Sequence, residues 1–164
     1  MLAAAALLAA HGAQAETYEQ GFYASMSAEY DSNAAFSPRD PVGVWRFAAI
    51  PAYTFMTVSG VDRWNARANL RLERSTNESV SAPRQDPNLF VNWTRETPRG
   101  ELGITVRYEE QSTRETELLD TGRGAADGTR ATRALSGRWN RALSERSDLL
   151  FDGGYTGVTY TGTN

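Results

Sequence analysis

Hydrophobic and polar residues alternate along most of this chain with a period of two. The clearest example is the segment 61–74, in which apolar side chains occupy every second position. The apolar set is Trp64, Ala66, Ala68, Leu70 and Leu72, and the intervening polar set is Arg63, Asn65, Arg67, Asn69, Arg71 and Glu73. Successive side chains of a β-strand point to opposite faces, whereas a helix would scatter both sets around its circumference. The segment is therefore predicted to be a strand with one apolar face and one polar face.

The same alternation recurs in six further segments, at about residues 22–30, 44–58, 89–93, 101–111, 135–139 and 148–160. Most of these strands are predicted to hold about ten residues or more, where an average globular strand has about five or six. Tight turns at 59–62, 97–100 and 143–146 alternate with long polar links at 31–41, 75–87 and 114–130. Pro51 falls inside the second strand, where it removes one donor from the ladder. The predicted fold class is all-β, an antiparallel up-and-down sheet of about seven strands.

Two kinds of protein contain such strands. In a soluble sandwich or small barrel the apolar faces point inward, whereas in a transmembrane barrel they contact lipid and the polar faces line the interior. A tilted spanning strand needs about 9–11 residues, and bacterial barrels alternate short periplasmic turns with longer outer loops. Trp64 and Trp93 lie near tight turns, and Tyr30 and Trp45 lie near a long link, as in the two aromatic belts of a membrane barrel. We favour the transmembrane β-barrel.

The N-terminus has the features of an export signal. Residues 1–10 are apolar without interruption, and residues 13–15 form an Ala-Gln-Ala cleavage motif. The apolar run is too short to span a bilayer, which takes about 20 residues. We predict a signal peptide over residues 1–15 and an outer-membrane barrel domain over residues 16–164, with long loops outside the cell and tight turns in the periplasm. Bacterial barrels use an even number of strands without open edges, so seven strands are expected to be the N-terminal part of a larger, here incomplete, barrel.

Several segments carry a resemblance to a known family. Residues 29–33 and the combination of Trp45 with Ile50 and Pro51 resemble outer-membrane β-barrel porins found with exopolysaccharide and PEP-CTERM gene systems. The later segments that resemble the same family are 117–122, 135–139, 143–149 and 155–160. The resemblance covers nearly all of the chain after the signal, and family members are much longer. It implies an outer-membrane barrel with a role in polysaccharide export or surface assembly, and it supplies no catalytic residues.

Strand parity divides the candidate functional residues into two sets. The residues expected to face lipid are Trp64, Leu70, Leu72, Leu102, Ile104 and Val106. The residues expected to line a channel and set its selectivity are Arg46, Arg63, Asn65, Arg67, Asn69, Arg71, Glu73, Arg107, Glu109 and Arg138. Arginines of this second set form a charged ladder that would select ions or sugars, with Glu73 and Glu109 available as partners. A structural ion-pair network without a transport role fits the same pattern. Three arginines have apolar-face parity but lie near strand ends, where they can extend to lipid headgroups: Arg95, Arg133 and Arg141.

The amino-acid composition excludes most kinds of catalytic site. The chain has no cysteine, and its single histidine, His11, lies in the predicted signal. Disulfides, thiolate zinc sites and histidine catalysis in the processed chain are therefore excluded. The formal net charge of −3 gives no basic field for nucleic acid. Glu115, Glu117, Asp120 and Asp127 suit calcium by type but not by EF-hand spacing, and a solvated loop is the simpler interpretation. We predict no metal, no cofactor and no enzyme activity, with a carboxylate-only hydrolase as the remaining enzymatic alternative.

The expected function is that of a porin-like barrel in a Gram-negative outer membrane, either a passive channel or a barrel associated with exopolysaccharide export. One alternative is a small soluble secreted β-barrel or sandwich that binds a ligand, and another is a non-conducting barrel that presents its loops. The expected partners are outer-membrane lipid and lipopolysaccharide, the barrel-assembly machinery with periplasmic chaperones, and a polysaccharide. Nucleic acid is not an expected partner.

Overall fold

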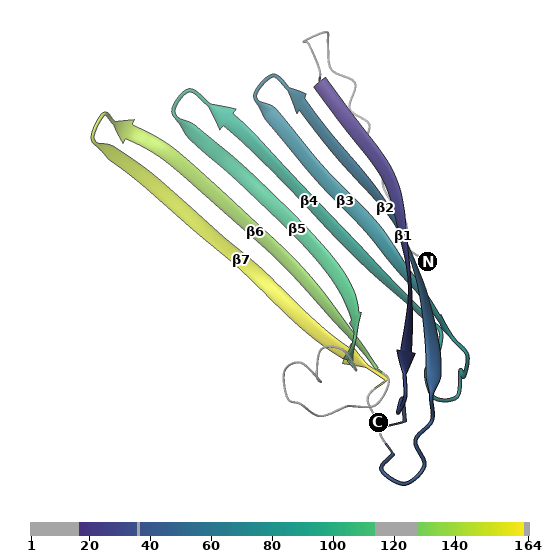
Figure 1. The fold of residues 1–164 in the computed structure, drawn as a ribbon. Helices are drawn as coiled ribbons and strands as arrows, with labels where there is room; N and C mark the ends of the chain where they lie inside the picture. The colour runs from purple at the N-terminus through teal and green to yellow at the C-terminus, as the bar shows by residue number, and fades with distance from the viewer. Residues whose placement is uncertain (1–16, 36, 114–127, 163–164) are drawn as a thin grey trace.

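Seven long strands form a single sheet in the computed structural model, which describes residues 17–35, 37–113 and 128–162 (Figure 1). The strands are β1 (Thr17–Asp31), β2 (Val44–Ser59), β3 (Asp62–Ser75), β4 (Arg84–Thr97), β5 (Gly100–Ser112), β6 (Thr129–Ser144) and β7 (Ser147–Thr161). Strands that follow one another in sequence are neighbours in the sheet, and all six pairings are antiparallel. The predicted all-β, up-and-down, seven-stranded sheet is confirmed. The predicted signal peptide and the four carboxylates considered for calcium lie outside the described residues.

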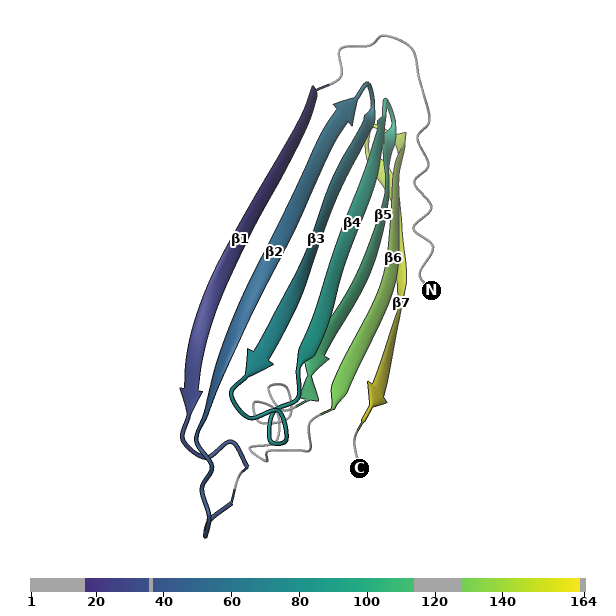
Figure 2. The same cartoon turned by 90° about the vertical axis from the view of Figure 1, so that its right-hand side faces the viewer.

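The sheet is twisted, curved and open (Figures 1 and 2). Its order runs from β1 to β7, so these two strands are its edges and no pairing joins them. The tight turns that follow β2, β4 and β6 lie at one end of the sheet, and β1, β3 and β5 end at the other, as the alternation of link lengths predicts (Figure 1). Closure of the sheet into a barrel stays a prediction.

The strands extend farther than the sequence pattern indicates. β1 begins at Thr17 rather than near residue 22, and β6 begins at Thr129. β4 begins at Arg84, so the prediction of a loop over residues 75–87 is wrong in its last four residues. Residues 84–87 pair in register with residues 70–73 of β3, and this backbone ladder extends the strand through a segment whose composition resembles a loop.

Two prolines lie inside strands at positions that the ladders accommodate. The β2–β3 pairing stops at Ala49, skips Ile50 and Pro51, and resumes at Ala52. Pro87 pairs with β3, but the β4–β5 register begins only at the following residue. Proline has no backbone donor, so each interruption lies where the missing N–H would have been needed.

Hydrogen bonds hold the described parts of the long links. Asn33 exchanges two bonds with Ser37, since its Nδ2 donates to the carbonyl of Ser37 at 3.1 Å and its Oδ1 accepts from the Ser37 amide at 3.0 Å. The carbonyl of Asn77 accepts the Ser81 amide at 3.0 Å. Gly60 in the first tight turn has φ 59°, a left-handed conformation that favours glycine. These hydrogen bonds and the left-handed Gly60 therefore fit the pairing register of the strands that the links and the turn connect.

The sheet has almost no conventional hydrophobic core. The buried apolar side chains among the described residues are Ala34, Val44, Ala48 and Ala52. Large apolar side chains are exposed instead, with Phe22 at 75% and Met26 at 85%. Leaving such a side chain in water forfeits about 1.5–3 kcal/mol relative to full burial. One face of this sheet therefore needs an apolar environment that these seven strands do not supply to one another.

Candidate lipid-facing and channel-lining surfaces

The pairing register assigns the strand residues to two faces. The apolar face is the one that carries, from β1 to β7, Met26, Phe47, Leu70, Leu89, Val106, Leu135 and Phe151. The polar face is the one that carries Glu29, Arg46, Arg67, Asn92, Arg107, Arg138 and Asp152. The alternation stays in register across all seven strands except for a shift between Ala142 and Ser144 at the end of β6, so each face is one continuous surface.

The six residues predicted to contact lipid all lie on the apolar face. Five of them are between 36% and 43% exposed: Trp64, Leu72, Leu102, Ile104 and Val106. Leu70 is half-buried between β2 and β4. The part of the chain that the structure describes places no second sheet or helix over this face. Such a broad exposed apolar surface is typical of a face that is covered by a partner or a membrane.

Aromatic side chains lie on the apolar face near its tight-turn end. The rings of Trp64 and Trp93, directly opposite each other on β3 and β4, have centroids 6.0 Å apart. The indole Nε1 of Trp93 donates to Asp62 Oδ1 at 3.0 Å, and Arg95 Nε lies 3.7 Å from the same oxygen. The apolar surface therefore ends in a polar rim, with tryptophan between the two.

A second aromatic group lies on the same face near the long links. The Tyr30 and Trp45 centroids are 5.2 Å apart on β1 and β2. On β5 the Tyr108 hydroxyl bonds to Glu110, and the guanidinium of Arg133 lies 5.8 Å from the Tyr108 ring centroid. Amphipathic aromatic rings at both borders of an apolar band are typical of chains that cross a bilayer. Arg95 and Arg133 lie at these borders, as their positions in the sequence predict.

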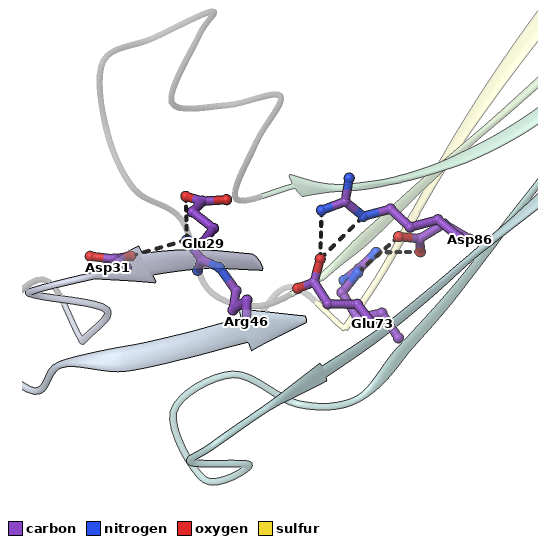
Figure 3. A network of polar contacts seen from close by, with 7 residues as sticks. Glu29, Asp31, Arg46, Glu73 and Asp86 are labelled. Carbon is purple, nitrogen blue, oxygen red and sulfur yellow. Dashed lines mark hydrogen bonds and ion pairs between the residues drawn. The ribbon is translucent and has the colours of Figure 1, made fainter. Parts of the chain in front are cut away.

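The ten residues predicted to line a channel all lie on the polar face, and ion pairs cluster at its long-link end (Figure 3). Arg46 Nη2 lies 3.1 Å from Glu29 Oε1 and 3.3 Å from Asp31 Oδ2, which joins β2 to β1. On β3 Arg71 Nη2 lies 2.6 Å from Glu73 Oε2. Charges at this end of the polar face are therefore largely neutralised by one another.

The ion pair of Arg84 with Asp86 is deeply buried, and the sequence pattern does not predict it. Arg84 Nη2 lies 2.8 Å from Asp86 Oδ1, and the two side chains are 10% and 9% exposed. Arg84 also donates to the Gly128 carbonyl at 3.0 Å and to Thr129 Oγ1 at 3.4 Å, so it crosses β5 to reach the start of β6. The polar composition of residues 75–87 predicts a loop, whereas the pairing of Arg84 and Asp86 with β3 places both side chains on the polar face.

Arg107 and Glu109 share the polar face of β5, but they do not pair with each other. Glu109 accepts a hydrogen bond from Gln111 Nε2 at 2.5 Å, and Arg107 lies over the ring of Phe90 at 5.7 Å rather than against that carboxylate. Glu73 pairs with Arg71, as predicted, whereas Arg46 reaches the acids of β1. An arginine side chain is long enough to reach carboxylates on either neighbouring strand. The alternation along a strand therefore determines which face an arginine occupies but not which carboxylate it pairs with.

A polar hollow of about 520 Å³ lies on the polar face over β4 to β7. Gly103 and Gly154 lack the side chains that would fill it. Its polar lining includes Asn92, Thr94, Glu101, Thr105, Arg138 and Asp152. Amide, hydroxyl and charged groups in this mixture favour water or a polar solute over an apolar ligand.

Neither a metal-ligand cluster among the described residues nor a match to a known protein adds a functional site to these two faces. Among residues 17–35, 37–113 and 128–162, no cluster of three or more potential ligands could hold a metal ion. In the same ranges no helix is both long and apolar enough to cross a bilayer. No family model, curated protein or solved structure matches the chain. The resemblance to exopolysaccharide-associated porins therefore stays a prediction.

Proposed function

We propose that this sheet is part of the wall of an outer-membrane β-barrel that acts as a channel for small polar solutes. The observation that carries the proposal is the register-wide separation of an exposed apolar face from a charged face, with aromatic side chains at both borders of the apolar one. Lipid would cover the first face and water would wet the second. The resemblance in the sequence adds an association with exopolysaccharide export to this proposal.

Strand length supports a membrane-spanning arrangement. β5 has 13 residues. At about 3.4 Å per residue these extend about 41 Å, and a tilt of about 40° reduces the rise across the membrane to about 31 Å. The hydrocarbon core of a bilayer is about 30 Å thick. The shortest strand of this sheet is therefore long enough to cross.

The two open edges of the sheet need neighbouring strands if the sheet lies in a membrane. Each unpaired backbone group in hydrocarbon costs several kcal/mol, so β1 and β7 both need a strand beside them in the assembled barrel. Further strands on either side would meet that requirement and would also set the diameter of the channel.

The four tryptophans provide a direct test, because Trp45, Trp64, Trp93 and Trp139 all lie on the apolar face. Lipids brominated on their acyl chains should quench the intrinsic fluorescence of the folded protein in vesicles. Bromines near the headgroups should quench more strongly than bromines at the chain ends, because the rings lie near the borders of the band. Iodide added to the water should quench weakly. Strong iodide quenching with no effect of brominated lipid would refute the membrane assignment and favour the soluble ligand-binding alternative.

Conductance separates a channel from a barrel that only presents loops. The protein reconstituted in a planar bilayer should give discrete current steps in KCl. Quenching by brominated lipid without any current would support the structural barrel and contradict the channel.

A further inference from the structure

Two arginines and an aromatic ring form a row across the middle of the polar face. Arg67 on β3, Phe90 on β4 and Arg107 on β5 lie directly opposite one another. The Arg107 guanidinium lies 5.7 Å from the Phe90 ring centroid, and that of Arg67 lies 5.8 Å from the Tyr23 centroid on β1. Tyr23 pairs with Ala52 of β2 and Arg67 pairs with Thr54, so the ring and the guanidinium meet diagonally across β2. Aromatic rings orient both guanidinium groups without neutralising their charge.

The positive charge of this row is not balanced locally. Neither Arg67 nor Arg107 has a carboxylate within ion-pair distance among the described residues, and both are exposed. The nearest acid along β5, Glu109, is hydrogen-bonded to Gln111. Four other arginines of the polar face have carboxylate partners: Arg46, Arg63, Arg71 and Arg84. Arg138 makes no ion pair among the described residues, but the acidic Asp152 lies directly opposite it on β7. The central row therefore presents two guanidinium groups without a carboxylate partner at one level of the polar face.

The adjacent row on the tight-turn side carries no charge from β2 to β7. Its members are Met56, Asn65, Asn92, Thr105, Ser136 and Gly154. Amides and hydroxyls can donate to anion oxygens, and none of these groups repels a negative solute. Arg67 and Arg107 are two strands apart, about 10 Å between backbones, and Phe90 lies between them, so an anion would approach both guanidinium groups from the open side of the polar face.

Resting on the proposed channel, we infer that the row Arg67–Phe90–Arg107 selects small anions, such as chloride, carboxylates and phosphate. Rings of arginine or lysine select anions in pores, because fixed positive charge concentrates counter-ions. A guanidinium about 5 Å from a permeating ion in water enriches anions about fourfold at low salt. Selectivity of the channel therefore depends on these two residues of the ladder rather than on its ion-paired arginines.

The reversal potential of the reconstituted protein tests this inference. In an about tenfold KCl gradient at low ionic strength, the wild-type channel should prefer chloride over potassium. The double variant R67Q/R107Q should lower the chloride-to-potassium permeability ratio by about fourfold or more. R67K/R107K should keep the preference, because the charge is retained. R141Q is the matched control: it removes one arginine at a strand end on the apolar face and should leave the reversal potential unchanged.

The outcomes separate this inference from the proposed function. A conducting channel that is unselective or cation-selective would overturn the inference and leave the channel standing. An anion preference that survives R67Q/R107Q would also overturn it, and so would loss of the preference in R67K/R107K. Absence of any current from correctly folded protein would overturn the channel and the inference together. Heat-modifiable gel migration of each variant establishes that it has folded.

Discussion

An arginine placed at the centre of the apolar face should strongly oppose folding into a bilayer. Val106 is the best position, because it lies six residues from each end of β5 (Gly100–Ser112). Its cross-strand neighbours on the apolar face are Val91 and Leu135, so no polar group lies directly opposite. The perturbation is Val106→Arg. The matched control is Thr105→Arg, which adds the same side chain one residue away on the polar face.

The position of Val106 along β5 determines how much free energy Val106→Arg should cost. Six residues span about 20 Å of strand, which a tilt of about 40° converts to about 15 Å of depth, half the thickness of the hydrocarbon core. Arginine on the lipid face at the midplane of a barrel costs about 2–4 kcal/mol. That cost lowers the folding equilibrium constant between about 30-fold and about 800-fold. Thr105→Arg should cost no more than about 1 kcal/mol, because the half-buried Thr105 loses the hydrogen bond that its hydroxyl accepts from Asn92 Nδ2 at 3.0 Å.

Urea titration in lipid vesicles measures both variants, with the folded fraction read from heat-modifiable gel migration. Val106→Arg should shift the midpoint to lower urea at an unchanged slope, and Thr105→Arg should shift it much less. Equal midpoints for the two variants would refute the assignment of faces. A larger loss for Thr105→Arg would show that β5 presents its polar face to an apolar environment.

Two further substitutions test the borders of the sheet. Trp93→Phe removes the indole donor to Asp62 and should destabilise the protein in vesicles by about 1 kcal/mol. Trp64→Phe should cost less, because the Trp64 indole donates no hydrogen bond within the described residues, and an equal loss would argue against that bond. Arg84→Gln leaves the buried carboxylate of Asp86 without its charge partner and should cost about 3 kcal/mol in the same urea assay. Adding Asp86→Asn should recover part of that loss, and full additivity of the two changes would contradict a coupled pair.

Parity in the sequence predicted which face each side chain occupies. The reason is physical, since a strand turns every second residue to the same side and a shift of one residue would expose the opposite set. Trp64, Leu72 and Val106 are therefore found together on one surface, and Arg67 and Arg107 on the other. No tertiary information was needed for that assignment.

Strand ends and side-chain partners could not be predicted in the same way. β4 begins at Arg84 because its backbone pairs with β3, although a proline and polar residues follow. Arg84 finds Gly128 and Thr129 two strands away, at sequence separations of 44 and 45 residues. Such contacts depend on the curvature of the sheet and on the reach of long side chains, and local alternation contains neither.

The order of the sheet has a consequence for how it can assemble and evolve. Each described strand contacts chiefly the strands before and after it in sequence, so the architecture is one-dimensional, like that of a repeat protein. Pairing can begin at any hairpin and extend outward by adding its neighbours. For the same reason, a gene duplication that inserts one whole hairpin would leave the remaining internal ladders intact. The width of such a sheet can thus change by pairs of strands while the length of its strands stays constant.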